Sequence, residues 1–252
     1  MKPAAISSPS GVKLGSGAMF DRIAERYDLL NRILSLGVDQ RWRRLAVRAL
    51  RLSPGARVLD VATGTADLAA AIVRSAPGVT VVGLDPSARM LSVAAAKVER
   101  HGLSGRIALA NGDAEQLPFE PHSFDAAAMA FGIRNVPDRA RALRELARVV
   151  RPGGRIAILE LSEPRQGLFG SLGRVYMHEL VPRVGALLSG ATEYRYLQSS
   201  IARFPPPPEF AELMRRNGLE NVEGTELTFG VCCLFVGTSP AAAPSNVAPE
   251  QV

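Results

Sequence analysis

The central part of the chain alternates between short apolar runs and longer stretches in which apolar residues recur every three or four positions. Short runs bounded by turn residues are typical of buried strands, and the longer spacing is typical of helices packed on one face. We expect strands at 57–62, 79–84, 106–110, 124–131, 155–161, 219–228 and 231–237, and helices at 66–76, 87–100, 138–150 and 209–217. Strands that alternate with helices form a parallel sheet covered on both faces, here closed by an antiparallel end, so the pattern predicts an α/β fold.

The ends of the chain have a different composition from its middle. We expect a single domain over residues 18–238, which begins with a helical cap at 18–52 and carries a helical insertion at 165–204. The first 17 residues are rich in Pro, Ser, Gly and Ala, and residues 239–252 form an Ala/Pro stretch without a pattern. Segments of this kind cannot bury enough apolar surface to fold, so we expect two disordered tails, 1–17 and 239–252.

The strongest local signal is Arg57–Asp67, where an apolar strand breaks into a turn that contains Gly64 and Thr65 before a helix begins. Such a turn presents free backbone N–H groups to a ligand. A dinucleotide site would have a third glycine where this chain has Asp67. We interpret that acid, together with Asp60 just before the turn, as a sign of a cationic ligand, S-adenosylmethionine, in place of a dinucleotide.

Two further loops follow strands at the same predicted edge of the sheet. Asp85 ends the second strand, where a carboxylate can accept hydrogen bonds from ribose hydroxyls. Asp113 and Ala114 follow the third strand, where an acid can hold an adenine amino group, with Leu117 and Phe119 near the ring. Each loop alone is an ordinary turn signal, but the three in this order and spacing resemble the nucleotide motifs of class I methyltransferases.

The loop after the fourth strand, Ala130 to Pro137, is less generic. Gly132 permits close approach of the backbone, and Arg134 and Asn135 put a cation and an amide at the edge where a methyl acceptor must lie. Taken alone, Arg134 is better explained as a surface salt-bridge partner. Both interpretations stay open at this point.

Composition narrows the class of protein. At 252 residues with 47% hydrophobic content the chain can bury a full core. The net charge of +6 raises the question of a polyanionic partner, but the excess is dispersed apart from a cluster of five arginines between Arg41 and Arg51 on a predicted helix that Asp39 would cap. A solvated basic face explains that cluster better than a contact with anionic lipid or an anionic substrate does.

Cysteine usage points to a reducing compartment. Cys232 and Cys233 are the only cysteines, and neighbours on a strand point to opposite faces, so neither a disulfide nor a metal site follows from them. We expect two core thiols and a cytoplasmic protein. The sequence shows no run of membrane-spanning length and no signal-peptide core.

Several methyltransferase chemistries leave marks that this sequence lacks. There is no Pro-Cys nucleophile of the pyrimidine C5 type and no Asn-Pro-Pro-aromatic or Asp-Pro-Pro-aromatic motif of the amino-directed nucleic-acid enzymes. The three histidines, His101, His122 and His178, are scattered, so none is a convincing catalytic base or metal ligand. We therefore expect no metal and no nucleic-acid partner.

Three stretches of the chain resemble the signatures of one family, the ubiquinone/menaquinone biosynthesis C-methyltransferases. They are Tyr27-Asp28-Leu29-Leu30-Asn31 with Trp42, Phe131-Gly132-Ile133-Arg134-Asn135, and Arg148 to Gly154 continued by Glu160 to Pro164. Three positions depart from the family pattern. Asp39 stands where the first signature usually has histidine, Ala130 stands where some members have a serine, and Ala66 replaces a second glycine as in the menaquinone-specific members.

The resemblance implies a Rossmann-like class I S-adenosylmethionine-dependent methyltransferase, with a mostly parallel seven-stranded sheet, helices on both faces and an N-terminal helical cap. The implied reaction is methyl transfer to a ring carbon of a polyprenylated quinol, converting demethylmenaquinol to menaquinol. C-methylation of 2-polyprenyl-6-methoxy-benzoquinol in ubiquinone biosynthesis is the alternative. From other classes, a nucleic-acid methyltransferase and a non-catalytic adenosine-binding module are the competing hypotheses.

The motifs and the resemblance together yield a list of site residues. We expect S-adenosylmethionine to contact Asp60, Gly64, Thr65, Asp85, Asp113, Ala114 and Ala130. We expect catalysis to depend on Arg134, which would stabilise the developing quinolate oxygen directly or through water, on Asn135, which would hold that oxygen or the water, and on Tyr27, which would cap the ring. A substrate with an isoprenoid tail also implies a peripheral contact with the inner face of the membrane, and a homodimer is compatible with the sequence.

Overall fold

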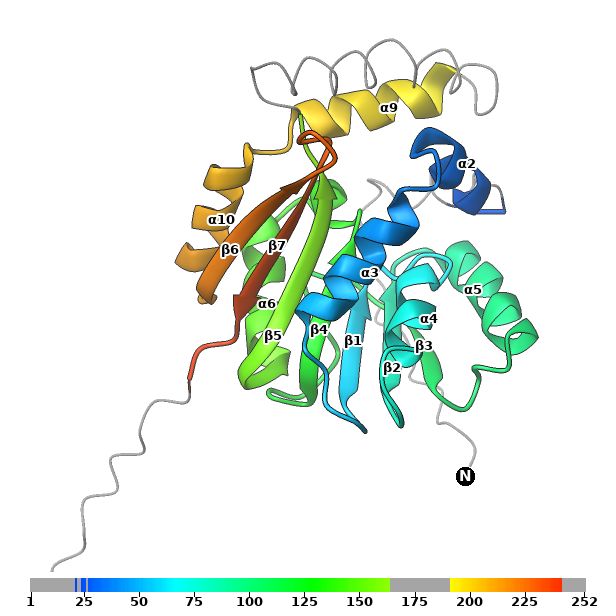
Figure 1. Cartoon of the computed structure of the whole chain (residues 1–252), viewed down its shortest axis with the longest axis vertical. Helices are drawn as coiled ribbons and strands as arrows, with labels where there is room; N and C mark the ends of the chain where they lie inside the picture. Colours follow the sequence, from blue (N-terminus) through cyan, green and yellow to red (C-terminus); the bar gives the residue numbers. More distant parts are fainter. Residues whose placement is uncertain (1–20, 22–23, 26, 164–190, 242–252) are drawn as a thin grey trace, which may run out of the picture.

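The computed structural model describes residues 21, 24–25, 27–163 and 191–241. The first predicted tail, the second predicted tail from residue 242 onward and most of the predicted insertion lie outside these residues. The described chain forms a seven-stranded sheet of order β3-β2-β1-β4-β5-β7-β6 (Figure 1). The strands are β1 Arg57–Val61, β2 Thr80–Asp85, β3 Ile107–Asn111, β4 Phe124–Ala130, β5 Val150–Leu161, β6 Glu220–Leu227 and β7 Cys232–Thr238.

Five neighbouring strands of this sheet are parallel and the last two close it in antiparallel fashion, as the sequence pattern predicts. The helices are α2 Tyr27–Leu34, α3 Asp39–Ala49, α4 Asp67–Val73, α5 Ala88–Arg100, α6 Arg139–Val149, α9 Ala191–Ala202 and α10 Pro207–Arg216, with a short 3-10 turn η1 at Ile133–Asn135. The α/β prediction is therefore confirmed.

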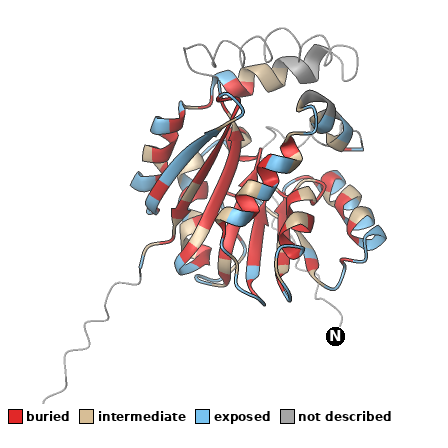
Figure 2. Cartoon of the chain, viewed as in Figure 1, coloured by how far each residue is buried: buried red, intermediate tan, exposed pale blue. Residues whose placement is uncertain are grey.

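Helices cover both faces of the sheet, and each face has its own apolar core (Figure 2). One core lies under α3, α4 and α5, and the other lies under α6 and α10. Cys232 belongs to the first core and Cys233 to the second, and both are fully buried free thiols. This confirms that neighbouring cysteines on a strand face opposite sides. Burial raises the pKa of the Cys232 thiol well above its ordinary value, with a smaller effect from Glu160.

Strand β5 is longer than predicted. It begins at Val150, five residues before the expected start, because the chain pairs with β4 through an irregularity in register between Phe124 and Ala126. A Cβ at Gly154 would lie 2.6 Å from the carbonyl oxygen of Asp125, so only glycine permits this approach. The Pro-Gly-Gly sequence therefore accommodates the irregular pairing of β5 with β4.

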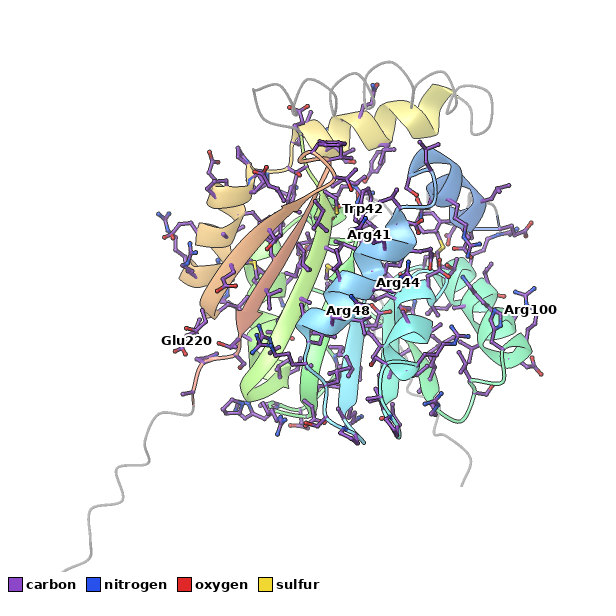
Figure 3. All side chains as sticks on the ribbon, in the orientation of Figure 1. Arg41, Trp42, Arg44, Arg48, Arg100 and Glu220 are labelled. Carbon is purple, nitrogen blue, oxygen red and sulfur yellow. The ribbon has the colours of Figure 1, made fainter. Side chains whose placement is uncertain are left out.

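Helix α3 corrects two expectations. Asp39 is the first residue of the helix instead of its cap, which is Val38, and its buried carboxylate accepts a hydrogen bond from Ser35 Oγ at 3.0 Å. Arg43 does not belong to the solvated basic face. It is 6% exposed, lies 3.6 Å from the Asp39 carboxylate and stacks on the ring of Phe131 with 5.0 Å to the centroid. The exposed arginines of this region are Arg41, Arg44, Arg48 and Arg51, three of which are labelled in Figure 3.

Candidate active site

The loops that follow β1, β2, β3 and β4 meet at the end of the sheet that α2 and α9 approach in Figure 1. Backbone contacts join them in sequence. Thr63 N donates to the carbonyl of Leu84 at 3.0 Å, Gly64 N to the Asp85 carboxylate at 2.8 Å, and Gly112 N to the carbonyl of Asp85 at 3.2 Å. In open α/β sheets the carboxyl edge of the parallel strands is where ligands bind. The predicted loops therefore share one edge.

The turn after β1 is held in an unusual conformation. Ala62, Gly64 and Ala66 all have positive φ, at 54°, 56° and 66°. This region costs roughly 1–2 kcal/mol for a residue with a side chain, and alanine is the smallest such residue. The turn therefore keeps its left-handed backbone with little side-chain bulk, which leaves its surface open to a ligand.

Asp60, at the end of β1, is buried with one oxygen unsatisfied. Its Oδ2 accepts a hydrogen bond from Thr63 Oγ1 at 2.6 Å, while Oδ1 has no hydrogen-bond partner among the described residues. Burial raises the pKa of this carboxyl to about 7, although the Thr63 hydrogen bond and the charge of Arg43 lower it. A cation near Oδ1 would satisfy the free oxygen and favour the ionised form.

Asp85, at the end of β2, connects the turn after β1 to the start of α5. Its two oxygens accept from Gly64 N at 2.8 Å and Ser87 N at 2.9 Å, and Ser87 Oγ in turn caps α5 by accepting from Met90 N. Burial raises the pKa of Asp85, and the two backbone hydrogen bonds lower it by less. Each carboxylate oxygen has a second lone pair, so Asp85 can orient the turn and still accept a ligand hydroxyl.

Asp113 and Ala114 lie in the loop after β3, where Asp113 is exposed and accepts from Glu115 N at 2.9 Å. Ala114 is 8% exposed. Leu117 and Phe119, which we expected near a ligand ring, both pack against apolar residues of the core. Leu117 is a core residue, and Phe119 packs edge-on against Phe124 with 5.0 Å between centroids. Apolar packing below the edge accounts for both side chains.

Asp67 has a different role from the one its position in the motif suggested. Its carboxylate forms a very short ion pair with Lys97 of α5, whose ammonium also lies 2.5 Å from Asp28 of α2. Burial raises the pKa of Asp67, but the hydrogen bond and charge of Lys97 outweigh it and lower the pKa. Asp67 thus pairs with a cation of the protein, and our inference that its charge awaits a cationic ligand was wrong. Thr65 is nearly buried and donates to Asp28 Oδ1 at 2.5 Å.

In the loop after β4, Arg134 is buried instead of lying at the surface. It is 8% exposed, and its Nη1 donates to Glu160 Oε1 at 2.5 Å and to the carbonyl of Phe131 at 2.8 Å. Its backbone N–H also donates to Glu160 Oε2 at 3.1 Å. The interpretation of Arg134 as a surface ion-pair partner is therefore wrong, although it does pair with an acid. Its Nε is buried and has no hydrogen-bond partner among the described residues.

The pKa of Arg134 reflects these neighbours. Burial lowers it, but the charge and hydrogen bond of Glu160, with contributions from Tyr27 and Tyr196, raise it above the ordinary value. Sequence reasoning had not singled out Glu160, which is fully buried at the end of β5. An acid that follows four apolar residues in a central strand is the signal that could have identified it, because such an acid needs a buried partner.

Asn135 and two tyrosines, Tyr27 and Tyr196, lie at the same edge of the sheet as Arg134. Tyr196 of α9 donates from its hydroxyl to Asn135 Oδ1 at 3.1 Å, and Tyr196 is a further residue that the sequence list lacked. The Tyr27 ring reaches the cofactor turn, since its Cε1 would lie 4.0 Å from a Cβ at Gly64. Ala130, at the end of β4, is a core residue with 8% exposure. The structure thus brings Arg134, Asn135 and Tyr27 to one edge.

The remaining sites considered from the sequence lie elsewhere. His122 is exposed and its Nδ1 lies 3.2 Å from the carbonyl of Val150, and His178 lies outside the described residues. Within the described part of the chain, no group of three or more His, Cys, Asp or Glu side chains is arranged to hold a metal ion. No helix in the same residues is long and apolar enough to cross a membrane.

The strand order and the loops at its carboxyl edge define a Rossmann-like class I methyltransferase fold. Solved structures support that class at the level of fold. The chain aligns with the [4+2]-cyclase SpnF at a TM-score of 0.67 and 19% identity, over 90% of this chain and 96% of that one. It aligns with a SAM-dependent methyltransferase from Thermotoga maritima at a TM-score of 0.58 and 22% identity, over 88% and 99%.

The chain belongs to the ubiE/COQ5 methyltransferase family, whose profile matches residues 13–239. It is 46% identical to the ubiquinone/menaquinone biosynthesis C-methyltransferase UbiE of Syntrophotalea carbinolica, over 87% of this chain and 92% of the relative. It is 48% identical to the demethylmenaquinone methyltransferases of Deinococcus radiodurans, over 87% and 90%, and of Thermus thermophilus, over 88% and 100%. The resemblance drawn from the signatures is therefore confirmed.

The buried Arg134–Glu160 pair leads to a stability prediction. Glu160→Gln should lower the free energy of unfolding by about 3 kcal/mol, because the Arg134 guanidinium would stay buried without its counter-charge. Urea unfolding at neutral pH would measure the change. Glu212→Gln is the matched control, since it removes exposed pairs with Arg215 and Arg216 and should leave the unfolding midpoint unchanged. A Glu160→Gln midpoint equal to that of the wild type would contradict the prediction.

Proposed function

We propose that this protein transfers a methyl group from S-adenosylmethionine to a ring carbon of demethylmenaquinol, giving menaquinol. The observation that carries the proposal is the meeting of two loops. The turn after β1, with Asp60 and Thr65, and the loop after β4, with Arg134 and Asn135, lie in direct contact at one edge of the sheet. The two demethylmenaquinone methyltransferases at 48% identity support the choice of acceptor.

The residues of the cofactor side fit S-adenosylmethionine. Its methionine part carries an ammonium group, which suits the unsatisfied Oδ1 of Asp60. Its ribose hydroxyls suit the remaining lone pairs of Asp85, and the adenine would lie near Asp113 and Ala114. The open left-handed turn around Gly64 leaves room for the chain between them. When bound, this donor supplies a methyl group on a sulfonium, so the leaving group needs no acid.

The acceptor side has to remove a proton from the quinol and hold the ring in line with the methyl group. We assign the stabilisation of the developing quinolate oxygen to the free Nε–H of Arg134, because its Nη1 already donates to Glu160 and Phe131. Asn135 would hold the same oxygen or a water beside it, with its amide oriented by Tyr196. Tyr27, beside Gly64, would cover the ring.

One assay separates the competing functions. The purified protein is supplied with labelled S-adenosylmethionine and, in parallel, with a demethylnaphthoquinol, a 6-methoxybenzoquinol and transfer RNA. We expect methyl transfer to the naphthoquinol and weaker transfer to the benzoquinol. Preference for the benzoquinol would move the assignment to ubiquinone biosynthesis. Methylation of RNA, or tight donor binding with no transfer to any acceptor, would overturn the proposal.

A membrane contact is part of the proposal because the acceptor carries an isoprenoid tail. Three large apolar side chains in the described part of the chain are more than half exposed: Leu29 on α2, Leu36 in the following turn and Phe229 in the β6–β7 turn. Leu36 and Phe229 also have positive φ, at 50° and 58°, where exposed apolar residues are uncommon. The β6–β7 turn is tied to α3 by a 2.9 Å hydrogen bond from Trp42 Nε1 to Thr228 Oγ1.

We term these three side chains the apolar rim. The β6–β7 turn that carries Phe229 is linked through Trp42 to the loop after β4, since Trp42 also packs against Phe131 with 6.3 Å between centroids. The exposed Arg41, which lies on α3 next to Trp42, can contact anionic headgroups (Figure 3). Apolar tips beside basic side chains are typical of surfaces that insert shallowly into a bilayer. We therefore favour the apolar rim over the predicted insertion, which lies mainly outside the described residues, as the docking surface.

The apolar rim is tested by Leu36→Asn combined with Phe229→Asn, since asparagine tolerates positive φ. We expect binding to anionic vesicles to fall at least roughly tenfold, because two apolar side chains that would insert into the bilayer are lost. The affinity for S-adenosylmethionine should not change. Flotation would measure the first and calorimetry the second. Arg100→Gln, on an exposed residue of α5 outside the rim, is the control and should float like the wild type. Equal flotation of the double variant would refute the rim.

The raised pKa of Asp60 predicts a pH dependence of donor binding. Below pH 7 the carboxyl is protonated in the free protein, so binding a ligand ammonium has to displace that proton. Affinity for S-adenosylmethionine should therefore increase by up to roughly tenfold per unit between about pH 5.5 and 7, a range in which the ligand ammonium stays charged. Calorimetry across this range would check it. Asp60→Asn should bind more weakly and without this slope, and a flat wild-type profile would contradict the assignment.

The assignment of Arg134 predicts a specific kinetic effect. Arg134→Lys keeps the charge opposite Glu160 but has no N–H at the position of Nε, so the rate of methyl transfer should fall roughly a hundredfold with little change in donor affinity. Single-turnover kinetics and calorimetry would measure the two quantities. Near-full turnover in the variant would exclude Arg134 from the chemistry and leave it the role of fixing the loop.

A further inference from the structure

Lys97 lies at the centre of a small ionic cluster between three helices. Its ammonium is 2.5 Å from Asp28 Oδ2 of α2, forms a very short contact with Asp67 Oδ1 at the start of α4, and lies 3.4 Å from Thr65 Oγ1. Thr65 donates to the other oxygen of Asp28 at 2.5 Å. We term these four residues, Asp28, Thr65, Asp67 and Lys97, the α2 latch. The Lys97 ammonium thus contacts two carboxylates and the hydroxyl that donates to one of them.

The α2 latch is shielded from water. The side chains of Lys97 and Asp67 are each 13% exposed, and that of Asp28 is 30% exposed. Ion pairs in such positions are screened far less than exposed ones, so they can hold elements in place. Without the lysine charge, Asp28 and Asp67 would repel each other across the cluster, and α2 would lose its attachment to α4 and α5.

The latch fixes a segment that covers the cofactor turn. Asp28 follows Tyr27, whose ring lies over Gly64, and Thr65 belongs to the same turn. Two further contacts join the segment before α2 to the start of α5: Ser87 Oγ donates to Asp21 at 2.5 Å, and Arg89 pairs with Glu25 at 2.7 Å. The Arg89–Glu25 pair is exposed, at 58% and 72%, so it contributes little.

We propose that Lys97 is a positioning residue that holds α2, and with it Tyr27, over the cofactor turn. The inference rests on the proposed binding of S-adenosylmethionine at that turn. A cap fastened by a few shielded ion pairs opens and closes without unfolding the sheet, so donor and product exchange pass through release of the α2 latch. Lys97 touches neither donor nor acceptor in this scheme. It acts through Asp28 and Thr65.

The test compares Lys97→Met with the wild type by stopped-flow release of S-adenosylmethionine and of S-adenosylhomocysteine. We expect the release rate of both to increase at least tenfold and the KM for the donor to rise in parallel, while kcat falls by a smaller factor, because Tyr27 would then cover the acceptor ring for less of the time. Lys97→Arg should restore slow release, because it keeps the charge. Arg89→Met is the matched control: it breaks an exposed pair to the same segment and should change release less than twofold.

Asp28→Asn is the second variant, for the case that Lys97→Met does not fold, since it leaves the Lys97–Asp67 pair intact. It should also speed release. In the double variant with Lys97→Met, the increase in release rate should be smaller than the product of the two single-variant increases. Release rates within twofold of wild type in Lys97→Met or, if that variant does not fold, in Asp28→Asn would overturn the inference. A wild-type protein that releases the donor slowly but methylates no quinol would overturn the proposed acceptor and leave the latch standing.

Discussion

The contact between the loops after β1 and β4 sets the geometry of the whole site. A Cβ at Gly132 would lie 2.6 Å from the Cβ of Ala62, so the two loops approach as closely as backbones allow. Both loops accept left-handed φ at this boundary, 54° at Ala62 and 61° at Phe131. Such conformations cost roughly 1–3 kcal/mol each and persist only where the surrounding structure enforces them, here by the parallel pairing of β1 with β4. The loops after β1 and β4 are therefore fixed relative to each other, and in the proposed function so are the donor and the acceptor.

Two polar atoms without partners flank this boundary. Asp60 Oδ1 is an acceptor on the donor side, and Arg134 Nε is a donor on the acceptor side; both are buried and unsatisfied within the described residues. Keeping Asp60 ionised against a pKa of about 7 costs roughly 4 kcal/mol relative to an exposed aspartate. Arg43 Nε, Ser123 Oγ and Arg155 Nε are also buried without a hydrogen-bond partner in the described residues. In the proposed function, a ligand would complete the hydrogen bonds of Asp60 and Arg134. The distribution of the two atoms matches a site that binds one partner on each side.

The alternation of short apolar runs with helical stretches along the chain was enough to predict the sheet, because apolar runs and turn residues are local signals. It also placed Asp60, Asp85 and Arg134 at one edge, since parallel strands end together. What it missed are pairings between distant residues. The charge of Asp67 is balanced by Lys97, thirty positions away, and Arg134 is paired with Glu160, twenty-six positions away. Periodicity carries no information about which buried charge meets which, so the motif acid Asp67 was assigned to a ligand.

Arg43 shows the same limit of prediction from sequence periodicity within one helix. Five arginines on α3 and just beyond it looked equivalent, yet Arg43 turns inward to Asp39 and to the face of Phe131. Helical spacing places Arg43 beside the buried Trp42, but only the tertiary packing provides the aromatic ring and the acid that make burial of a guanidinium tolerable. Its charge then acts on the site, because it lowers the pKa of Asp60.

The pairing with Glu160 also determines what Arg134 can contribute to the proposed reaction. A lone buried cation would attract any electron-rich ring over several ångströms, whereas a guanidinium next to a carboxylate at 2.5 Å is nearly neutral at that range. Its effect on a substrate is then limited to the directed hydrogen bond from Nε, which weakens steeply away from the correct distance and angle. Only a quinol whose hydroxyl lies at that point gains from it. In the proposed reaction the acceptor would therefore be selected by the position of an oxygen held between Arg134 and Asn135, and the pair with Glu160 would make that selection possible.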